Sequence, residues 1–320
     1  MFVGRKNELD QFERLYDGGA FQCVVIYGRR RIGKTTLINE FIKGKKAIFF
    51  TASETSGEEN LKNLSQSIYD FSHNDGVAPV YPDFQSALDT LYELGKTERV
   101  VFVVDEYPYL ANSYKGISSL FQTQIDKKYL NSKLFIILSG SSMSFMENQV
   151  LGYKSPLYGR RTAQFKLLPF DFFDAANYFK GFSPYDAALL YGITGGIPQY
   201  LAQIKANLSV AENIKQNFLT PSTYLFEEPL NLLKQEVREP AGYNSIIKAI
   251  ATGSSKNSEI TSKVNLDSGA CTVYLNNLIS LGIVKKETPF AEDSARKTIY
   301  SLADGMFRFW YRFIPDNVSL

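Results

Sequence analysis

One segment near the N-terminus combines residue types and spacing that suit the binding of a nucleotide phosphate. Residues 28–35, with the sequence Gly-Arg-Arg-Arg-Ile-Gly-Lys-Thr, match the pattern G-x-x-x-x-G-K-[ST]. They follow an apolar run that predicts a strand and precede a helical pattern, which is the context that the motif requires. Glycines allow consecutive backbone N–H groups to curl around phosphate oxygens, and a helix start adds its positive dipole end. A basic, glycine-rich turn without a ligand is the alternative, and this context disfavours it.

The expected roles within this loop divide between backbone and side chains. The Lys34 ammonium can reach the β and γ phosphates of a nucleotide, and the Thr35 hydroxyl is a suitable ligand for Mg²⁺. We therefore expect a site for ATP or ADP together with Mg²⁺. The expected nucleotide-binding residues of the loop are Gly28, Arg31, Ile32, Gly33, Lys34, Thr35 and Thr36.

An acidic pair closes the strand predicted at 100–104. Asp105 and Glu106 follow four consecutive apolar residues, the arrangement of a Walker B segment. Asp105 is expected to hold the Mg²⁺ through its outer shell, and Glu106 is expected to polarise the attacking water. An acidic pair after a strand is often only a solvated turn, but its combination with the phosphate-binding loop favours the functional interpretation.

Two further positions are candidates for contact with the γ-phosphate. Ser139 begins a run of small residues after the strand predicted at 134–138, where its hydroxyl could sense that phosphate, although a simple turn explains the run equally well. Arg160 lies just before the last predicted strand, where its guanidinium could project toward the γ-phosphate of a neighbouring subunit. Arginine pairs in loops, such as Arg160 and Arg161, are more often solvated, so that alternative stays open.

An α/β sheet is needed to bring these residues together. Short apolar runs alternate with helical patterns in the first half of the chain, which indicates βαβ units and a mostly parallel sheet. The runs are nearly continuous rather than alternating, so the strands should be covered on both faces. The predicted strands are 21–27, 47–51, 100–104, 134–138 and 163–168, with helices starting near Gly33, Glu59, Phe84 and Gly116.

After Pro169 the predicted elements are helices only, which marks a second domain. We expect these helices at 171–180, 184–191, 198–206, 210–218 and 224–237. Pro240 and Gly242 mark a further boundary. After it we expect helices at 243–251, 258–264 and 268–281. Two β segments follow at 283–287 and 297–302, separated by a polar loop that contains Pro289 and Asp293. Three helices followed by two strands predict a winged helix. The expected domains are 1–170, 171–239 and 240–320.

Composition excludes several other classes of protein. The chain has 320 residues, is 44% hydrophobic and 21% charged, and has a net charge of only +2. These values suit a globular protein, and no apolar run approaches the roughly 18 residues of a membrane span. Two isolated cysteines are too few for a disulfide framework, and the single histidine, His73, leaves no His₃ or Cys₄ zinc site. The N-terminus has no leader pattern, so we expect a soluble, cytoplasmic protein without a membrane partner.

Several motifs together resemble the AAA+ ATPases, and within them the archaeal-type ATPases of the signal-transduction branch known as STAND. The resemblance covers nearly the whole chain. Besides the phosphate-binding loop and the acidic pair, it rests on residues 2–9, which are similar to a box near the adenine, and on residues 195–200, which are similar to a lid motif. The other segments that carry the resemblance are residues 139–142, 156–160 and 300–311. The resemblance implies that Val3, Gly4 and Arg5 lie near the adenine and that Pro198 belongs to the lid.

The same resemblance implies a P-loop AAA+ parallel sheet in the order 5-1-4-3-2, with a helical lid and a C-terminal winged helix. Two departures affect this expectation. Gln199 stands where many lids have a sensor arginine, so coupling of the lid to phosphate through a cation is in doubt. A restriction-endonuclease-like domain often follows in the family, and we expect it to be absent because the sequence stops at Leu320.

We therefore expect a Mg²⁺-dependent ATP-binding protein, with slow ATP hydrolysis coupled to movement of the lid and the winged helix. One alternative is an interaction switch that holds the nucleotide and scarcely hydrolyses it, acting on an unknown protein partner or through self-association. Another is a DNA-binding regulator, which rests on the winged helix alone. The helix expected to enter the major groove, 268–280, contains no Lys or Arg, so we expect DNA binding to be weak and without sequence choice.

Overall fold

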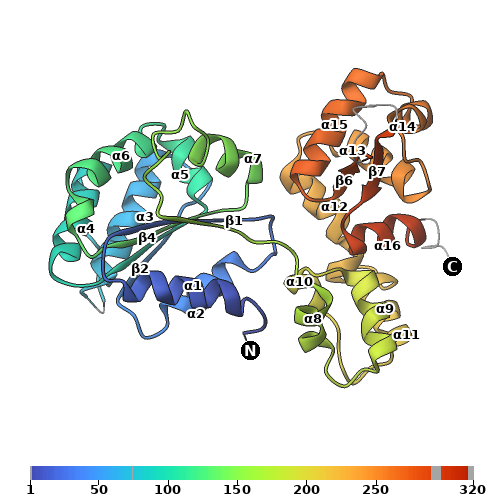
Figure 1. Cartoon of the computed structure of the whole chain (residues 1–320), viewed down its shortest axis with the longest axis horizontal. Helices are drawn as coiled ribbons and strands as arrows, with labels where there is room; N and C mark the ends of the chain where they lie inside the picture. Colours follow the sequence, from blue (N-terminus) through green and yellow to red (C-terminus); the bar gives the residue numbers. More distant parts are fainter. Residues whose placement is uncertain (1, 74, 290–296, 316–320) are drawn as a thin grey trace. The chain divides into compact units, whose positions relative to one another are not determined.

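The computed structural model describes residues 2–73, 75–289 and 297–315. The chain divides into two compact units, Met1–Leu168 and Pro169–Leu320, and each unit is described by itself (Figure 1). In the part of the chain that the structure describes, no helix combines the length and the apolar character that crossing a membrane requires.

A five-stranded parallel sheet forms the centre of the first unit. Its strands are β1 (Gln22–Tyr27), β2 (Ala47–Thr51), β3 (Val101–Asp105), β4 (Phe135–Gly140) and β5 (Ala163–Lys166). They lie in the order β2-β3-β4-β1-β5, which confirms the expected order 5-1-4-3-2. Every pairing is parallel, with Gln22 opposite Phe135 and Val24 opposite Ala163 in the two ladders of β1. Parallel strands end at the same edge, so the residues that follow β1, β3 and β4 gather there.

Helices cover both faces of this sheet, as the continuous apolar runs predict (Figure 1). One face packs on α1 (Lys6–Asp17) and α2 (Lys34–Ile42), where the rings of Phe12 and Phe41 contact Phe135. The opposite face, with Ile136 and Leu138, shares a core with the helices on its other side. Those helices are α3 (Gly57–Asp70), α4 (Phe84–Thr97), α5 (Tyr107–Ser113) and α6 (Ile117–Lys127), followed by η1 (Tyr129–Asn131) and, after β4, by α7 (Met143–Phe145) and η2 (Met146–Val150).

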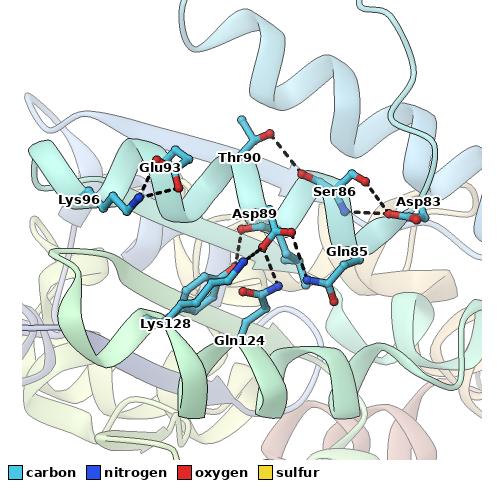
Figure 2. Close-up of polar contacts among 11 residues, drawn as sticks. Asp83, Gln85, Ser86, Asp89, Thr90, Glu93, Lys96, Gln124 and Lys128 are labelled. Atoms are coloured by element: carbon cyan, nitrogen blue, oxygen red, sulfur yellow. Dashed lines mark hydrogen bonds and ion pairs between the residues drawn. The ribbon is translucent and has the colours of Figure 1, made fainter.

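A polar network on the outside of the first unit joins α4 to α6 and the residue after it. Figure 2 shows the Asp89 carboxylate accepting hydrogen bonds from Lys128, from Gln124 at 3.0 Å and from Gln85 at 3.3 Å. The hydrogen bond from Lys128 is the main reason why the pKa of Asp89 lies below its ordinary value. Asp89 thereby connects α4 to α6, although Asp89 and Gln124 are 35 residues apart in the sequence.

The second unit begins with helices alone. They are α8 (Phe172–Ala175), η3 (Ala176–Phe179), α9 (Pro184–Thr194), α10 (Pro198–Leu201), α11 (Val210–Phe218) and α12 (Tyr224–Glu236). The prediction of a helix at 198–206 is too long, because α10 ends at Leu201. The side chain of Asn213 accepts from the backbone N–H of Lys205 and donates to its carbonyl, which holds that segment outside a helix.

Three helices and an antiparallel strand pair follow in the same unit. They are α13 (Pro240–Ala251), α14 (Asn257–Val264), α15 (Ser268–Ser280), β6 (Val284–Glu287) and β7 (Ile299–Leu302). This is the order of elements that the sequence analysis expects, and its interpretation as a winged helix stays a prediction. Of the two residues that marked the loop between the strands, Asp293 lies outside the described residues.

The aromatic segment near the C-terminus forms α16 (Gly305–Phe313). Phe307, Trp310 and Tyr311 are buried, and the indole Nε1 of Trp310 donates to the carbonyl of Phe226 at 2.8 Å. At the start of α16, a Cβ on Gly305 would lie only 3.1 Å from the carbonyl oxygen of Gly192, so the close approach of α16 to α9 requires glycine there.

Candidate nucleotide-binding site

The loop between β1 and α2 has the backbone conformation of a phosphate cradle. Arg31 and Gly33 both adopt left-handed conformations, with φ of 69° and 90°, which turns successive N–H groups inward. Gly28 passes so close to β5 that a Cβ would lie 2.6 Å from the carbonyl oxygen of Leu167. Ile32 is fully buried and anchors the loop from beneath, and α2 begins directly after Gly33. The loop is therefore held open at the N-terminus of a helix.

Lys34 is positioned inside this cradle. Its ammonium donates to the carbonyl oxygens of Gly28 at 3.0 Å and Arg29 at 3.3 Å, and the residue is only 6% exposed. A cation held at the mouth of a ring of N–H groups is complementary to a polyphosphate. Thr36, in the first turn of α2, is exposed.

The acidic pair lies beside the same helix start. The Thr35 hydroxyl donates to Asp105 Oδ2 at 2.9 Å, which brings the two predicted metal-binding side chains together. Hydroxyl and carboxylate oxygens are the donors that Mg²⁺ prefers, and it usually keeps several waters, so this pair fits the ion. The donor set in the structure thus matches both groups of a Mg·nucleotide.

Glu106 adopts a left-handed conformation, with φ of 53°, at the start of α5. Its Oε2 accepts from the hydroxyl of Ser141 at 2.8 Å and from the Ser141 backbone N–H at 3.3 Å. The carboxylate is therefore oriented by the segment that follows β4. The sequence analysis did not assign this contact, although Ser141 lies in the run of small residues that it singled out.

Ser139 lies on β4 and is fully buried. Within the described residues its hydroxyl has no hydrogen-bond partner. Side chains four residues apart on a strand share a face, so Ser139 lies on the same side of the sheet as Phe135, which packs on α2. A buried hydroxyl without a hydrogen-bond partner costs about 1–3 kcal/mol.

The N-terminal box also contacts the phosphate-binding loop. Gly4 and Arg5 both have positive φ, at 67° and 59°, just before α1. The Arg5 guanidinium donates to the carbonyl oxygens of Ile32 and Leu168, and the residue is 7% exposed. Val3 precedes this bend and is half-buried. This N-terminal segment therefore holds the phosphate-binding loop at the Ile32 carbonyl.

The two remaining candidates lie elsewhere. Arg160 is bound in a bidentate ion pair to Asp126, with N···O distances of 2.9 and 2.7 Å, and these hydrogen bonds raise the pKa of its guanidinium. Pro198 begins α10 in the second unit. A contact that the sequence analysis missed is that of Arg30, whose guanidinium donates to the Tyr109 hydroxyl on α5 at 2.9 Å.

The sheet order and the loop after β1 define a P-loop ATPase domain of the AAA+ class. The chain belongs to the family described as an ATPase domain predominantly from Archaea, which matches residues 2–204. It is 32% identical over 320 residues to an uncharacterised protein of Methanocaldococcus jannaschii, covering 100% of this chain and 70% of that protein. A segment of 46 residues is 48% identical to an uncharacterised ATP-binding protein of the same organism, covering 14% of this chain and 78% of that protein.

Two solved structures share the fold at low sequence identity. The Walker-type ATPase of Pyrococcus abyssi aligns with a TM-score of 0.71 and 22% identity, covering 98% of this chain and 96% of that one. The ORC2 protein of Aeropyrum pernix, in its ADPNP–ADP complexes, aligns with a TM-score of 0.62 and 16% identity, covering 98% and 93%. The resemblance to archaeal-type AAA+ ATPases is thus confirmed, and family membership supports ATP binding and ATPase activity in general terms.

Proposed function

We propose that the protein binds Mg·ATP at the loop between β1 and α2 and hydrolyses it slowly. The observation that carries this proposal is the hydrogen bond of 2.9 Å between Thr35 and Asp105, next to a buried Lys34 held in the loop. Lys34 and the inward N–H groups would bind the β and γ phosphates, and Thr35 and Asp105 would hold Mg²⁺. Bound Mg²⁺ neutralises charge on the phosphate oxygens.

Glu106 is proposed as the group that orients and activates the attacking water. Ser141 holds one carboxylate oxygen, which leaves the other to accept a proton from water. Ser139 is proposed as the γ-phosphate sensor because its buried hydroxyl has no partner among the described residues. Val3, Gly4 and Arg5 are proposed to border the adenine, and Pro198 to act from the lid.

Arg160 is proposed to act on the γ-phosphate of a neighbouring subunit. Its ion pair with Asp126 supports a role away from its own loop, and that pair must open before the guanidinium reaches another molecule. An arginine supplied in this way is a common device for stabilising the charge of phosphoryl transfer. Self-association would then be part of the activity.

We further propose that nucleotide state changes the position of the lid and the winged helix, in a cytoplasmic protein. The alternative is an interaction switch that holds ATP with little hydrolysis, which the absence of a lid arginine at Gln199 favours. A DNA-binding regulator is the other alternative and rests on the three helices and two strands of residues 240–302.

The test compares binding and turnover in wild type and three variants. Wild type should bind ATP with Mg²⁺ and release phosphate slowly, Glu106→Gln should bind ATP but not release phosphate, and Asp105→Ala should need far more Mg²⁺. Glu98→Gln, which removes a half-buried carboxylate of the same unit, is the matched control and should behave as wild type. Equal turnover in Glu106→Gln and wild type would support the switch, and failure of wild type to bind ATP would refute the site.

A further inference from the structure

A cavity that is lined only by residues of the second unit lies beside α16. Its volume is about 620 Å³, within the range of about 300–1,000 Å³ that is usual for small-molecule sites. The end of α13, the strands β6 and β7, and α16 enclose it, and α13, β7 and α16 contact one another. The cavity is half-open, so a ligand can enter from solvent.

Three cations border this cavity. Arg308 and Arg312 are one turn apart on α16 and exposed, and Lys285 projects from β6. Among the described residues that line the cavity, none has a carboxylate. Glu287 lies outside it and binds Lys285 at 3.0 Å, which leaves the two arginines as the dominant charge. The cavity therefore favours an anion.

The arginines keep most of their hydrogen-bonding capacity for a ligand. Within the described part of the chain, no hydrogen bond or ion pair is formed by the guanidinium of Arg308, and Arg312 makes only a cation–π contact with the Phe313 ring at 5.5 Å. Two guanidinium groups on one helix face present paired N–H donors, which match phosphate oxygens better than a lone ammonium does.

The opposite wall of the cavity is built in advance of any ligand. It is formed by the turn 252–255, which follows α13. The Thr252 hydroxyl accepts from Lys263 at 2.7 Å, and the Ser255 carbonyl accepts from the Tyr300 backbone N–H at 2.7 Å, so this turn is fixed to both α14 and β7. Glu259 is occupied by the backbone N–H groups of Ser255 and Lys256 and does not line the cavity.

Apolar side chains complete the lining. Ile250 and Leu302 also line the cavity and are buried. A lining that combines cations with apolar side chains suits a molecule that carries a charged group on an apolar body, whereas the backbone of a nucleic acid needs an extended open face. The shape and the charge together select a small organic phosphate.

We propose that this cavity binds a small organic phosphate. Arg308 and Arg312 donate hydrogen bonds to the phosphate, and Ile250 and Leu302 contact the apolar part of the ligand. This site is separate from the phosphate-binding loop, because it is built entirely from the second unit. A ligand bound in this cavity would contact α16 and the strands β6 and β7.

The experiment uses phenyl phosphate as the probe on the full chain, with saturating Mg·ADP present throughout. Binding is followed through the indole signal of Trp310, the one tryptophan of the sequence, which lies on α16 two residues from each arginine in the sequence. Wild type should bind phenyl phosphate saturably, and Arg308→Ala or Arg312→Ala should each weaken binding about tenfold, because each removes charge-assisted hydrogen bonds. Lys285→Ala should have a smaller effect, since Glu287 already shares that charge.

Lys286→Ala is the matched control. Lys286 is the next residue of β6, so its side chain points to the opposite face, and it does not line the cavity. The proposal requires this variant to bind within about twofold of wild type, because Lys286 does not line the cavity. Equal weakening by Lys286→Ala and Arg308→Ala would show general charge attraction and overturn the proposal. Saturable binding unaffected by either arginine variant would overturn it as well.

Further ligands identify the chemistry. Inorganic phosphate should bind more weakly than phenyl phosphate, and benzoate more weakly again. Benzoate binding as tight as that of phenyl phosphate, or duplex DNA displacing the probe at micromolar concentration, would overturn the assignment to a small organic phosphate. The comparison of arginine variants does not depend on what the phosphate-binding loop holds, so this result and the fate of the proposed ATPase activity can be told apart.

Discussion

At the scale of single residues, Lys34 offers the most direct test of the nucleotide site. Lys34→Ala should abolish stabilisation by Mg·ATP, because it removes the side-chain cation that lies inside the loop. Wild type with ATP at 100 times its dissociation constant should gain about 2.7 kcal/mol of unfolding free energy. Thermal melts with and without Mg·ATP measure this gain. Lys43→Ala, at the far end of the same helix and exposed, should keep it. A full shift in Lys34→Ala would contradict the site.

The contact between Ser141 and Glu106 gives a second prediction at this scale. Ser141→Ala should lower turnover roughly threefold to tenfold while ATP affinity is retained, because the carboxylate loses a hydrogen bond that orients it. Steady-state phosphate release and equilibrium ATP binding separate the two effects. Ser142→Ala alters a neighbouring serine without that contact and should leave both unchanged. Faster turnover in Ser141→Ala would instead mean that Ser141 restrains Glu106.

At the scale of elements, Asp89 tests how α4 and α6 are joined. The pKa of Asp89 is lowered in the folded protein, chiefly by Lys128, so its stabilising contribution is present above the unfolded pKa of about 3.9 and is lost as pH falls through the folded value. Asp89→Asn should therefore lower the unfolding free energy at pH 7 by at most about 1 kcal/mol, since the side chain is 40% exposed. Near pH 3 the difference should shrink.

Urea unfolding at the two pH values measures this effect. Glu93→Gln is the control, because the partner of Glu93 within the described residues is Lys96 on its own helix (Figure 2). That variant should change stability by less than about 0.5 kcal/mol, the usual value for such a pair on one helix. An equal loss in both variants would show that the link between the two helices contributes nothing beyond surface charge.

The strands were predictable from the sequence, whereas several shorter elements were not. The strands β3 and β4 are nearly continuous apolar runs, because helices cover both faces of the sheet, and such runs are visible without a structure. The helix α5 was missed because it starts directly after Glu106, with Pro108 in its first turn and no polar linker before it. The early end of α10 depends on Asn213, a contact that arises only when the chain is folded.

The candidate site divides in a similar way. Motif spacing predicted that Thr35 and Asp105 bind the same metal ion, and their side chains lie within hydrogen-bonding distance of each other. It did not indicate that Glu106 turns through a left-handed conformation toward Ser141, because that depends on how β3 and β4 end side by side. The roles of all these residues in catalysis stay predictions.

At the scale of the whole molecule, the proposed role of Arg160 predicts that ATPase activity depends on self-association. Turnover per subunit should rise with protein concentration, because an arginine supplied by a neighbour is worth roughly 10³ to 10⁵ in rate. Arg160→Ala should remove the rise, and Lys154→Ala, which alters an exposed cation of the same loop region, should preserve it. A dilution series of phosphate release provides the measurement. Specific activity that stays flat over the series, with no loss on replacing both Arg160 and Arg161, would rule out this role.

The last prediction concerns DNA, and it follows from where the second unit has its cations. The helix α15 would enter the major groove in a winged helix, yet it carries no Lys or Arg, and its Cys271, Leu275 and Leu278 are buried in the core. Base recognition usually needs arginine on guanine, so α15 offers hydrogen bonds only from its polar residues, such as Thr272, Asn276 and Asn277.

Cations around α15 can contact phosphates but cannot select a sequence. Lys256, Lys263, Lys286 and Lys297 are described in the structure, whereas Arg296 lies outside the described residues. Together with Lys285 they predict about three to five phosphate contacts, each adding a slope of about −0.9 to the dependence of log affinity on log salt. Duplex DNA should therefore bind weakly, equally for unrelated sequences, and largely dissociate between 0.05 and 0.2 M salt, as titrations at about these two concentrations would show. Nanomolar, sequence-selective binding that survives about 0.2 M salt would contradict this prediction and favour the DNA-binding regulator over the ATP-driven switch.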